Sequence, residues 1–290
     1  MAARSTWWSL LWVPLWHWPA LAVSRMGSRI VSLWQGTAYI VAVICAVLAL
    51  AVRPRSWPRT VRAVFVRQVL YTTIDGLAVA LRVGMAVGIL LIVEAAMWLE
   101  TVGSTTEVVA PSLLAITVRE LGPLIACLVA IGRSGVAMAT EMANMKVHGE
   151  LDVLESQGID IMNYLVMPRV LSMMFSVFSL ALVIVAAIFL AGYTVGLVTG
   201  DIHAPPHEFF DSIFSKMKLT DLWFFLPKTL LSGLLMGTVC CLEGLHVRPL
   251  ATEVPRIASR SGVHALTAVF MINAIVSLII YGRVLIFQVL

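Results

Sequence analysis

The chain has 290 residues, of which 60% are hydrophobic and 12% are charged, and its formal net charge is +4. Soluble domains carry about 25% charged residues, and their apolar runs rarely reach the roughly 20 residues that a helix needs to cross a bilayer. The composition therefore excludes a soluble globular domain and predicts an all-α integral membrane protein, because helices satisfy their own backbone groups in lipid.

The first predicted element, residues 1–26, is a tryptophan-rich extension with Arg4 near its start. A basic start followed by small residues such as Ala20 and Ala22 is also typical of a secretory signal. Indole rings prefer the headgroup layer of a bilayer, so the tryptophans favour an interfacial extension. Retention of this extension in the mature chain is left open.

The next region, 27–70, contains an apolar stretch at 30–52 that is long enough to span and runs directly into a basic segment. Its basic residues are Arg53, Arg55, Arg59, Arg62 and Arg67. A basic amphipathic stretch of this kind is typical of a segment lying along an anionic membrane surface. The region is predicted to be an N-terminal interfacial or elbow helix, with a full span as the alternative.

Five longer hydrophobic segments follow, and together they predict a membrane domain over 71–290. They cover about 72–99, 111–140, 166–199, 222–247 and 263–289. Each exceeds the roughly 20 residues needed to cross the hydrocarbon layer. Basic residues gather in the N-terminal region and in the connections 141–165 and 248–262, so these are predicted to be cytoplasmic and the C-terminus to be outside.

Glycines spaced four residues apart occur at Gly84 and Gly88, at Gly192 and Gly196, and at Gly233 and Gly237. Such spacing permits close helix approach in lipid, either within one chain or across a homodimer seam. Pro123 removes a helical donor and predicts a kink. The predicted helix-packing positions are Gly84, Gly88, Gly122, Pro123, Gly132 and Gly135.

The sequence contains none of the usual motifs for nucleotide binding or nucleophilic catalysis, and it has no pair of cysteines at the spacing of a metal site. Its four cysteines lie in apolar segments and are interpreted as small hydrophobic residues. His203 and His207 are near enough to share a metal, but the intervening prolines disfavour one helical face, which favours a solvated outer loop. No metal site is predicted, and an enzyme is the weaker class.

The connection from Thr140 to Arg169 alternates charged and apolar residues. Val147, Leu151 and Leu154 recur at helical spacing, which predicts a short cytoplasmic helix with one apolar and one charged face. The helix either lies on the bilayer or docks on a protein, and its mainly acidic charge favours a protein partner because an anionic surface repels it. The predicted contact residues are Glu141, Lys146, His148, Glu150, Leu151, Asp152, Leu154 and Glu155.

The run "RELGPLIACLVAIGRSGVAMATEMANMKVHGELDVLESQGID", with "VRQV" at 66–69, "GMAVG" at 84–88 and "MPRV" at 167–170, resembles the MlaE/YrbE-type permeases of ABC transporters. These are the membrane subunits of MCE-protein lipid transport systems. The resemblance covers about residues 30 to 289 and is strongest from Arg119 to Arg169.

The resemblance implies a homodimeric permease in the bacterial inner membrane, with five spans and an interfacial helix, seated on cytoplasmic ATPase subunits. An MCE-domain protein on the outer side would exchange phospholipids or similar hydrophobic molecules with it. No cofactor is expected in this chain, since ATP and Mg would be handled by the ATPase. The coupling helix of the family would fall on about Glu141 to Gly158.

Arg119 and Glu120 lie roughly 13 Å along the helix predicted over 111–140, at membrane depth. In the family the matching pair lies by the lipid pocket, so Arg119 and Glu120 are predicted to meet a lipid headgroup; a structural ion pair is the alternative. Glu94, Arg82 and Asn273 are assigned to the same pocket. Glu94 and Asn273 differ from the enterobacterial member, which has an amide and a carboxylate there, so the headgroup preference is left open.

The segment from Asp201 to Asp221 carries phenylalanines at helical spacing and predicts an amphipathic helix at the outer surface. It either packs on the membrane or, as the resemblance implies, faces the MCE protein. The rival to an ABC permease is a stand-alone secondary carrier or channel. That class is typically built from internal repeats with broken helices, and the glycine pairs are the sole repetition in the chain.

Overall fold

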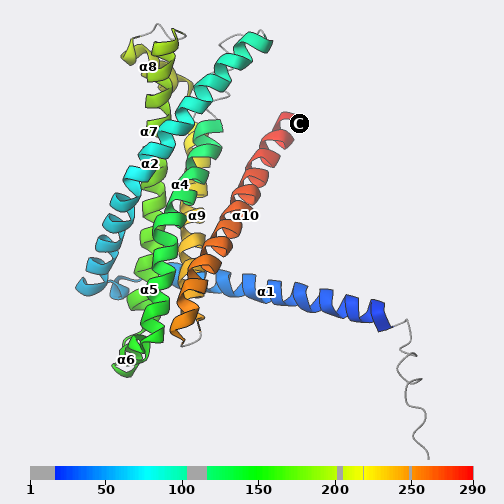
Figure 1. Ribbon diagram of the computed structural model, residues 1–290, viewed down its shortest axis with the longest axis vertical. Coiled ribbons are helices and arrows are strands. Elements are labelled where there is room, and N and C mark those ends of the chain that lie inside the picture. Colours follow the sequence, from blue (N-terminus) through cyan, green and yellow to red (C-terminus); the bar gives the residue numbers. More distant parts are fainter. Residues whose placement is uncertain (1–16, 103–115, 201–204, 218, 248–249, 290) are drawn as a thin grey trace, which may run out of the picture. The chain divides into compact units, whose positions relative to one another are not determined.

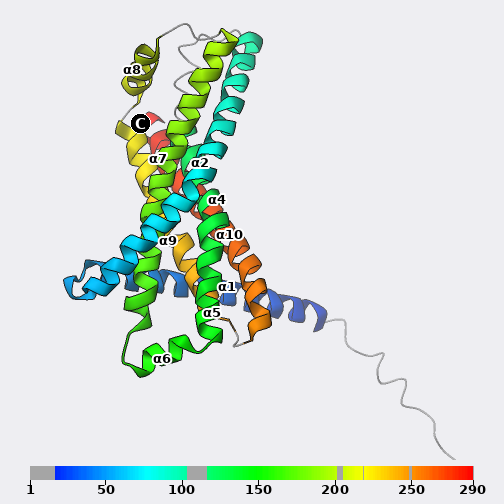
Figure 2. The same ribbon diagram turned by 60° about the vertical axis from the view of Figure 1, so that its left-hand side comes forward.

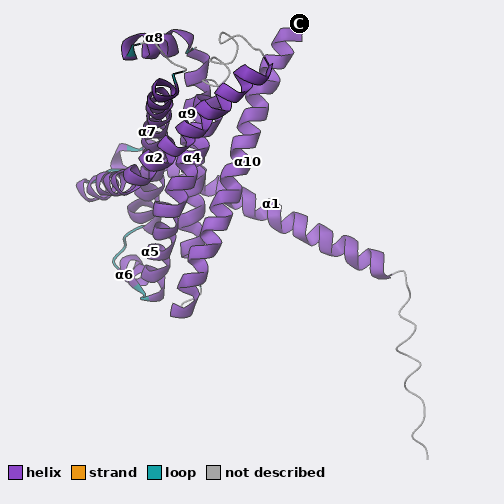
Figure 3. Cartoon of the chain, turned by 45° about the horizontal axis from the view of Figure 1, so that its top comes forward, coloured by secondary structure: helices purple, strands orange, loops and turns teal. Residues whose placement is uncertain are grey.

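The computed structural model describes residues 17–102, 116–200, 205–217, 219–247 and 250–289, and the regular structure of these residues is helical with no β-strand (Figure 3). Six of the described helices are long and apolar enough to cross a membrane. The prediction of an all-α integral membrane protein is therefore confirmed. The six include Trp34–Val52, so the stretch left open between span and elbow meets the length criterion for a span.

The chain divides into two compact units, Met1–Cys45 and Ala46–Leu290, with the boundary inside the first helix. The α-helices are α1 His17–Val52, α2 Arg59–Val102, α4 Gly122–Ala130, α5 Val136–Val147, α6 Glu150–Ser156, α7 Met167–Thr199, α8 Pro206–Lys216, α9 Leu219–Leu245 and α10 Val254–Val289. Shorter helices are η2 Pro54–Ser56, η3 Thr117–Leu121, η4 Ile131–Gly135, η5 Met162–Val166 and η6 Ala251–Glu253. Much of the first unit, including residues 1–16, lies outside the described part of the chain.

Within the larger unit, the turn that joins the end of α1 to α2 is held by Trp57. Its indole N–H donates to the carbonyl oxygen of Ala51 at 2.9 Å, which satisfies a backbone acceptor at the end of α1. The ring lies edge-on to Phe65 of α2, and Phe65 in turn meets Phe175 of α7. A tryptophan in the basic segment thus fixes the start of α2 against the bundle.

Helix α7 forms the centre of the bundle and packs against α2, α4 and α9, whereas α10 packs against α9 and α5 (Figure 1). The backbones come close because glycines face α7. A Cβ atom placed on Gly88 would lie 2.5 Å from the carbonyl oxygen of Ile188, and one on Gly233 would lie 2.8 Å from the Cα of Met174. Both contacts lie within one chain, which is one of the two arrangements that this glycine spacing permits in lipid.

Three π turns widen the helices of the bundle at η3, η4 and η5. The turn at η3 comes directly before Gly122 and Pro123, and the N–H of Gly122 bonds to the carbonyl of Thr117 in the i to i+5 pattern of a π turn. The helix therefore continues from Thr117 to Val147 past Pro123, because the wide turn accommodates the missing donor of the proline.

The connection after α5 differs in one respect from the sequence prediction. Val147, Leu151 and Leu154 were expected on one helical face, but the helix breaks at Gly149, whose φ of +74° suits a residue without a side chain. Only Leu151 and Leu154 share α6, and Leu151 is buried. Helix α6 lies at the opposite end of the bundle from α8 (Figures 1 and 2).

We expect Gly88→Ala to lower the free energy of unfolding by about 1–3 kcal/mol, because the new methyl group overlaps the backbone of α7. Gly132→Ala is the matched control, since a Cβ there has no neighbour within 4 Å, and its effect should stay within about 0.5 kcal/mol. Thermal unfolding of both variants in one detergent checks this. Equal midpoints for the two variants would show that α2 and α7 are not in close contact.

Candidate functional site

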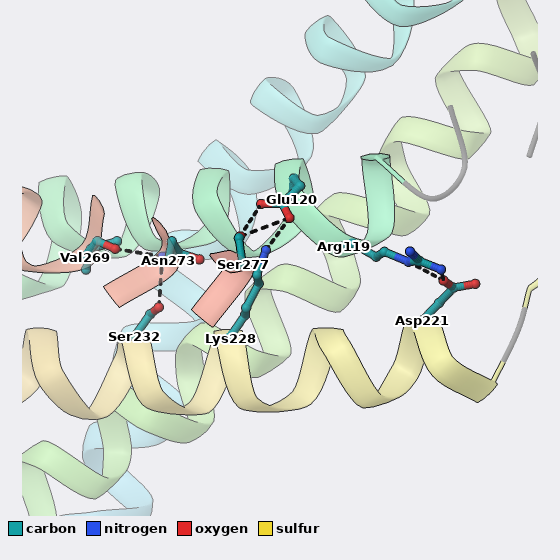
Figure 4. Close-up of polar contacts among 8 residues, drawn as sticks. All are labelled: Arg119, Glu120, Asp221, Lys228, Ser232, Val269, Asn273 and Ser277. Atoms are coloured by element: carbon teal, nitrogen blue, oxygen red, sulfur yellow. Dashed lines mark hydrogen bonds and ion pairs between the residues drawn. The ribbon is translucent and has the colours of Figure 1, made fainter. Parts of the chain in front are cut away.

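Glu120 in η3 faces two other helices and makes a polar contact with each (Figure 4). The ammonium group of Lys228 on α9 forms an ion pair and hydrogen bond with Oε1 of Glu120. The hydroxyl of Ser277 on α10 donates to the same carboxylate, at 3.2 Å from both oxygens. The Glu120 carboxylate thereby joins η3, α9 and α10.

Arg119, the neighbouring residue in η3, also contacts α9, at a point closer to the start of that helix than Lys228. Its guanidinium forms an ion pair with the carboxylate of Asp221 in the first turn of α9. The guanidinium carbon also lies 4.7 Å from the ring centre of Phe224, a cation–π distance. Asp221 and Lys228 are seven residues apart, so they share one face of α9 about 10 Å apart along its axis.

Asn273 extends these contacts along α9 and α10 toward the other end of the bundle. Its side-chain amide donates to the hydroxyl of Ser232 at 3.0 Å and to the carbonyl of Val269 at 2.9 Å. Ser232 lies one turn after Lys228, and Asn273 lies one turn before Ser277. The three groups of contacts follow one another along α9 and form a polar strip, which consists of Arg119, Glu120, Asp221, Lys228, Ser232, Asn273 and Ser277 (Figure 4).

The strip is electrically balanced but unevenly exposed. Its two cations, Arg119 and Lys228, match its two carboxylates, Glu120 and Asp221, so the formal charge is zero. The Lys228 side chain has 0% exposed surface and Asp221 has 4%, whereas Glu120 retains 35%. A charge inside a membrane protein is normally paired and marks a functional position. Glu120 is therefore the group of the strip that a ligand reaches most easily.

The structure brings together some, but not all, of the residues that the sequence assigned to the pocket. Arg119, Glu120 and Asn273 lie on the polar strip. Arg82 and Glu94 lie on α2 with exposed side chains, and Arg82 makes no ion pair within the described part of the chain. The partners around Glu120 come from α9 and α10 instead.

Sequence reasoning missed four members of the strip, Asp221, Lys228, Ser232 and Ser277. Lys228 carried a usable signal, because it is the single basic residue of the segment predicted over 222–247 and an intramembrane lysine needs a partner. Asp221, Ser232 and Ser277 carried none, since an acid at a span boundary and a serine within a span are common.

The predicted coupling segment separates into residues that hold the bundle and residues that face outward. The guanidinium of Arg169 on α7 donates to Glu141 at 2.8 Å, and the Lys146 ammonium donates to the carbonyl of Leu245 at the end of α9. His148 contacts the carbonyl of Asn144 and caps α5 locally. Three exposed acids, Glu150, Asp152 and Glu155, lie on α6.

The end of the bundle opposite α6 carries α8, which forms within the segment predicted to be amphipathic. Phe209 and Phe210 of α8 lie against the ring of Tyr193 on α7. His203 lies outside the described residues, and His207 is 3.9 Å from Glu208. Among the residues that the structure describes, no group of three metal-ligating side chains comes together.

Comparison with known proteins gives a consistent result. Residues 65–279 match the family described as Permease MlaE. A probable ABC transporter permease protein of Synechocystis is 30% identical over 210 residues, covering 71% of this chain and 78% of that relative. The intermembrane phospholipid transport system permease protein MlaE of Haemophilus influenzae is 24% identical, covering 75% and 82%. A probable ABC transporter permease protein of Rickettsia typhi is 28% identical, covering 56% of this chain and 62% of its own length, which is less than two thirds.

We expect Glu120→Gln to lower the free energy of unfolding by about 1–3 kcal/mol, because it leaves the buried Lys228 ammonium without a counter-charge. Lys228→Met in the same chain should recover most of this loss, since an apolar residue replaces the orphaned charge. Thermal unfolding of the single and double variants in detergent measures the coupling. Glu150→Gln is the control on an exposed carboxylate, and additive effects at 120 and 228 would contradict the ion pair.

Proposed function

The chain belongs to the MlaE permease family, and from this premise we propose that it moves phospholipids or similar hydrophobic molecules between the bacterial inner membrane and an MCE-protein partner. It is a multi-pass membrane protein and an ABC transporter permease, a class that works with a separate ATPase. ATP and Mg would be bound by that ATPase, and this chain would need no cofactor. The name of the Haemophilus influenzae relative supports phospholipid as the cargo class.

The polar strip is the proposed contact for the cargo, and the single observation that carries this is the partly exposed Glu120 in a predominantly apolar span. A lipid crossing such a surface needs an apolar wall for its chains and a polar group for its head. Glu120 supplies a carboxylate at the open edge, while Lys228 stays buried behind it. The ammonium of a lipid headgroup would replace Lys228 as the partner of Glu120, and a lipid phosphate would replace Glu120 as the partner of Lys228.

The acids of α6 are the proposed contact with the ATPase. Glu150, Asp152 and Glu155 are exposed, whereas Leu151 anchors α6 to the bundle. The preceding residues, Glu141 and Lys146, tie the end of α5 to α7 and α9. A force applied to α6 would therefore reach three helices of the bundle.

The basic residues of the segment after α1 and of the connections 141–165 and 248–262 favour the cytoplasmic side. With α1 lying along the membrane surface as an interfacial helix, they support a cytoplasmic N-terminus and a periplasmic C-terminus. This orientation directs α6 toward the cytoplasm and α8 toward the MCE partner. The permease is proposed to act as a homodimer, with the open edge of the polar strip facing the second copy.

We predict that Glu120→Gln lowers lipid transfer by about tenfold or more, on the scale of one charge-assisted hydrogen bond lost to the cargo. The informative variant combines Glu120→Gln with Lys228→Met, which restores stability but removes both charges. Transfer of labelled phospholipid between reconstituted vesicles and the MCE protein is the measurement. A double variant that transfers lipid as well as the unmodified chain would reduce the pair to a structural role.

Purification of the tagged chain from its own membranes should yield an ATPase in equal amounts. We expect Glu150→Lys with Asp152→Lys to reduce the recovered ATPase several-fold, because both acids are exposed on α6. The matched control is Glu208→Lys with Asp211→Lys, which reverses two exposed acids on α8 at the opposite end. Equal loss in both variants, or in neither, would contradict the coupling role of α6; recovery of the unmodified chain without any ATPase would favour a stand-alone carrier.

A further inference from the structure

A second polar feature, separate from the strip, is a cavity of about 490 Å³ between α2, the η4–α5 stretch and α7. Its lining residues come from the first half of α2, from η4 and α5, and from the start of α7. These parts of the helices lie toward the end of the bundle that carries α6 (Figures 1 and 2). We call it the Arg169 cavity. Its polar and charged lining includes Arg67, Gln68, Tyr71, Thr72, Asp75, Arg133, Ser134, Glu141 and Arg169.

Arg169 is the unusual member, because its buried charge is only partly compensated. The residue is 5% exposed, and its Nη2 donates to Glu141 at 2.8 Å. Its Nε and Nη1 are buried without any hydrogen-bond partner. Guanidinium N–H groups that are removed from water normally find acceptors, so two unpaired nitrogens beside a cavity indicate an acceptor that binds there.

The charges of the cavity favour an anion. Arg67, Arg133 and Arg169 supply three positive charges against the two carboxylates of Asp75 and Glu141, and Glu141 is already bound to Arg169. Arg133 makes no hydrogen bond or ion pair within the described residues. Arginine matches the oxygens of a phosphate with two parallel N–H bonds, so a set of three arginines suits a phosphate group.

The surroundings of the cavity suit a lipid. On α2, Leu70 and Ile74 are 52% and 62% exposed on the apolar surface beside the cavity lining. The basic segment that begins at Arg53 lies just before this stretch, at the level expected for headgroups. A volume of about 490 Å³ exceeds a bare phosphate and lies in the usual range for small-molecule sites.

We propose that the Arg169 cavity binds the phosphate group of a membrane phospholipid from the leaflet on the α6 side. This lipid is distinct from the cargo proposed for the polar strip. Glu120 of the strip and Glu141 of the cavity lie on one continuous helix, about 31 Å apart along its axis. The binding of a lipid in the cavity is therefore independent of the molecule that the strip transports.

The test is a site-specific crosslink, because phospholipid bound elsewhere on the protein must not be counted. Tyr71→benzoylphenylalanine places a photoreactive ring in the cavity lining. The full chain is irradiated in native membranes that contain phospholipid with a radiolabelled phosphate. We expect labelled lipid on the chain, and Arg133→Gln or Arg67→Gln should lower the labelling about tenfold, which corresponds to about 1.4 kcal/mol. Both arginines are exposed, so Arg169 and its ion pair stay intact.

The control variant is Arg62→Gln, an exposed arginine on α2 outside the cavity lining, which should label within twofold of the unmodified chain. Labelling that is equal in the Arg133→Gln, Arg67→Gln and Arg62→Gln variants would overturn the proposal, because the lipid would then be held by apolar contact alone. Labelling in a Glu120→Gln background should be unchanged, which separates this site from the strip. If inorganic phosphate displaced the labelled phospholipid as effectively as a short-chain phospholipid does, the occupant would be a soluble phosphate, and the proposal of a lipid would be overturned.

Discussion

The fully buried ammonium group of Lys228 is the constraint on which the arrangement of η3, α9 and α10 depends. A lysine without exposed surface in an apolar span is tolerated only with a counter-charge in contact. Glu120 meets that need, and Ser277 occupies the other side of the same carboxylate. The positions of the three elements are therefore fixed relative to one another by charge, whereas the contacts of α7 with α2 and α9 depend on close glycine packing.

Much of this architecture is predictable from the sequence, because the length of an apolar segment and the spacing of its glycines can be read within one short stretch of the chain. The all-α membrane architecture was confirmed on that basis. The resemblance to the MlaE family, which rests on motifs, was confirmed by the family match over residues 65–279. The pairing of charges was not predictable, since Glu120 and Lys228 are 108 residues apart and nothing in a single sequence relates them. The break at Gly149 was missed for a different reason, because periodicity registers apolar spacing and not a positive φ.

The strip and the Arg169 cavity share a design in which one cationic side chain is buried and its acidic partner is more exposed. Lys228 lies behind Glu120, and Arg169 lies behind Glu141, whose side chain is 55% exposed. In each case the cation is held in place by the fold, and its carboxylate partner lies nearer the surface. The two pairs therefore give the bundle a polar contact point near each end of the helix from Thr117 to Val147.

That helix runs for 31 residues, about 46 Å, through two π turns and past Pro123. Glu120 lies near its start, and the break at Gly149 follows its end. Because Lys228 lies on the adjacent helix α9, a rotation of this helix about its own axis would change the separation of the Glu120 carboxylate from the Lys228 ammonium. The ion pair would therefore be sensitive to the rotational position of the helix in the membrane.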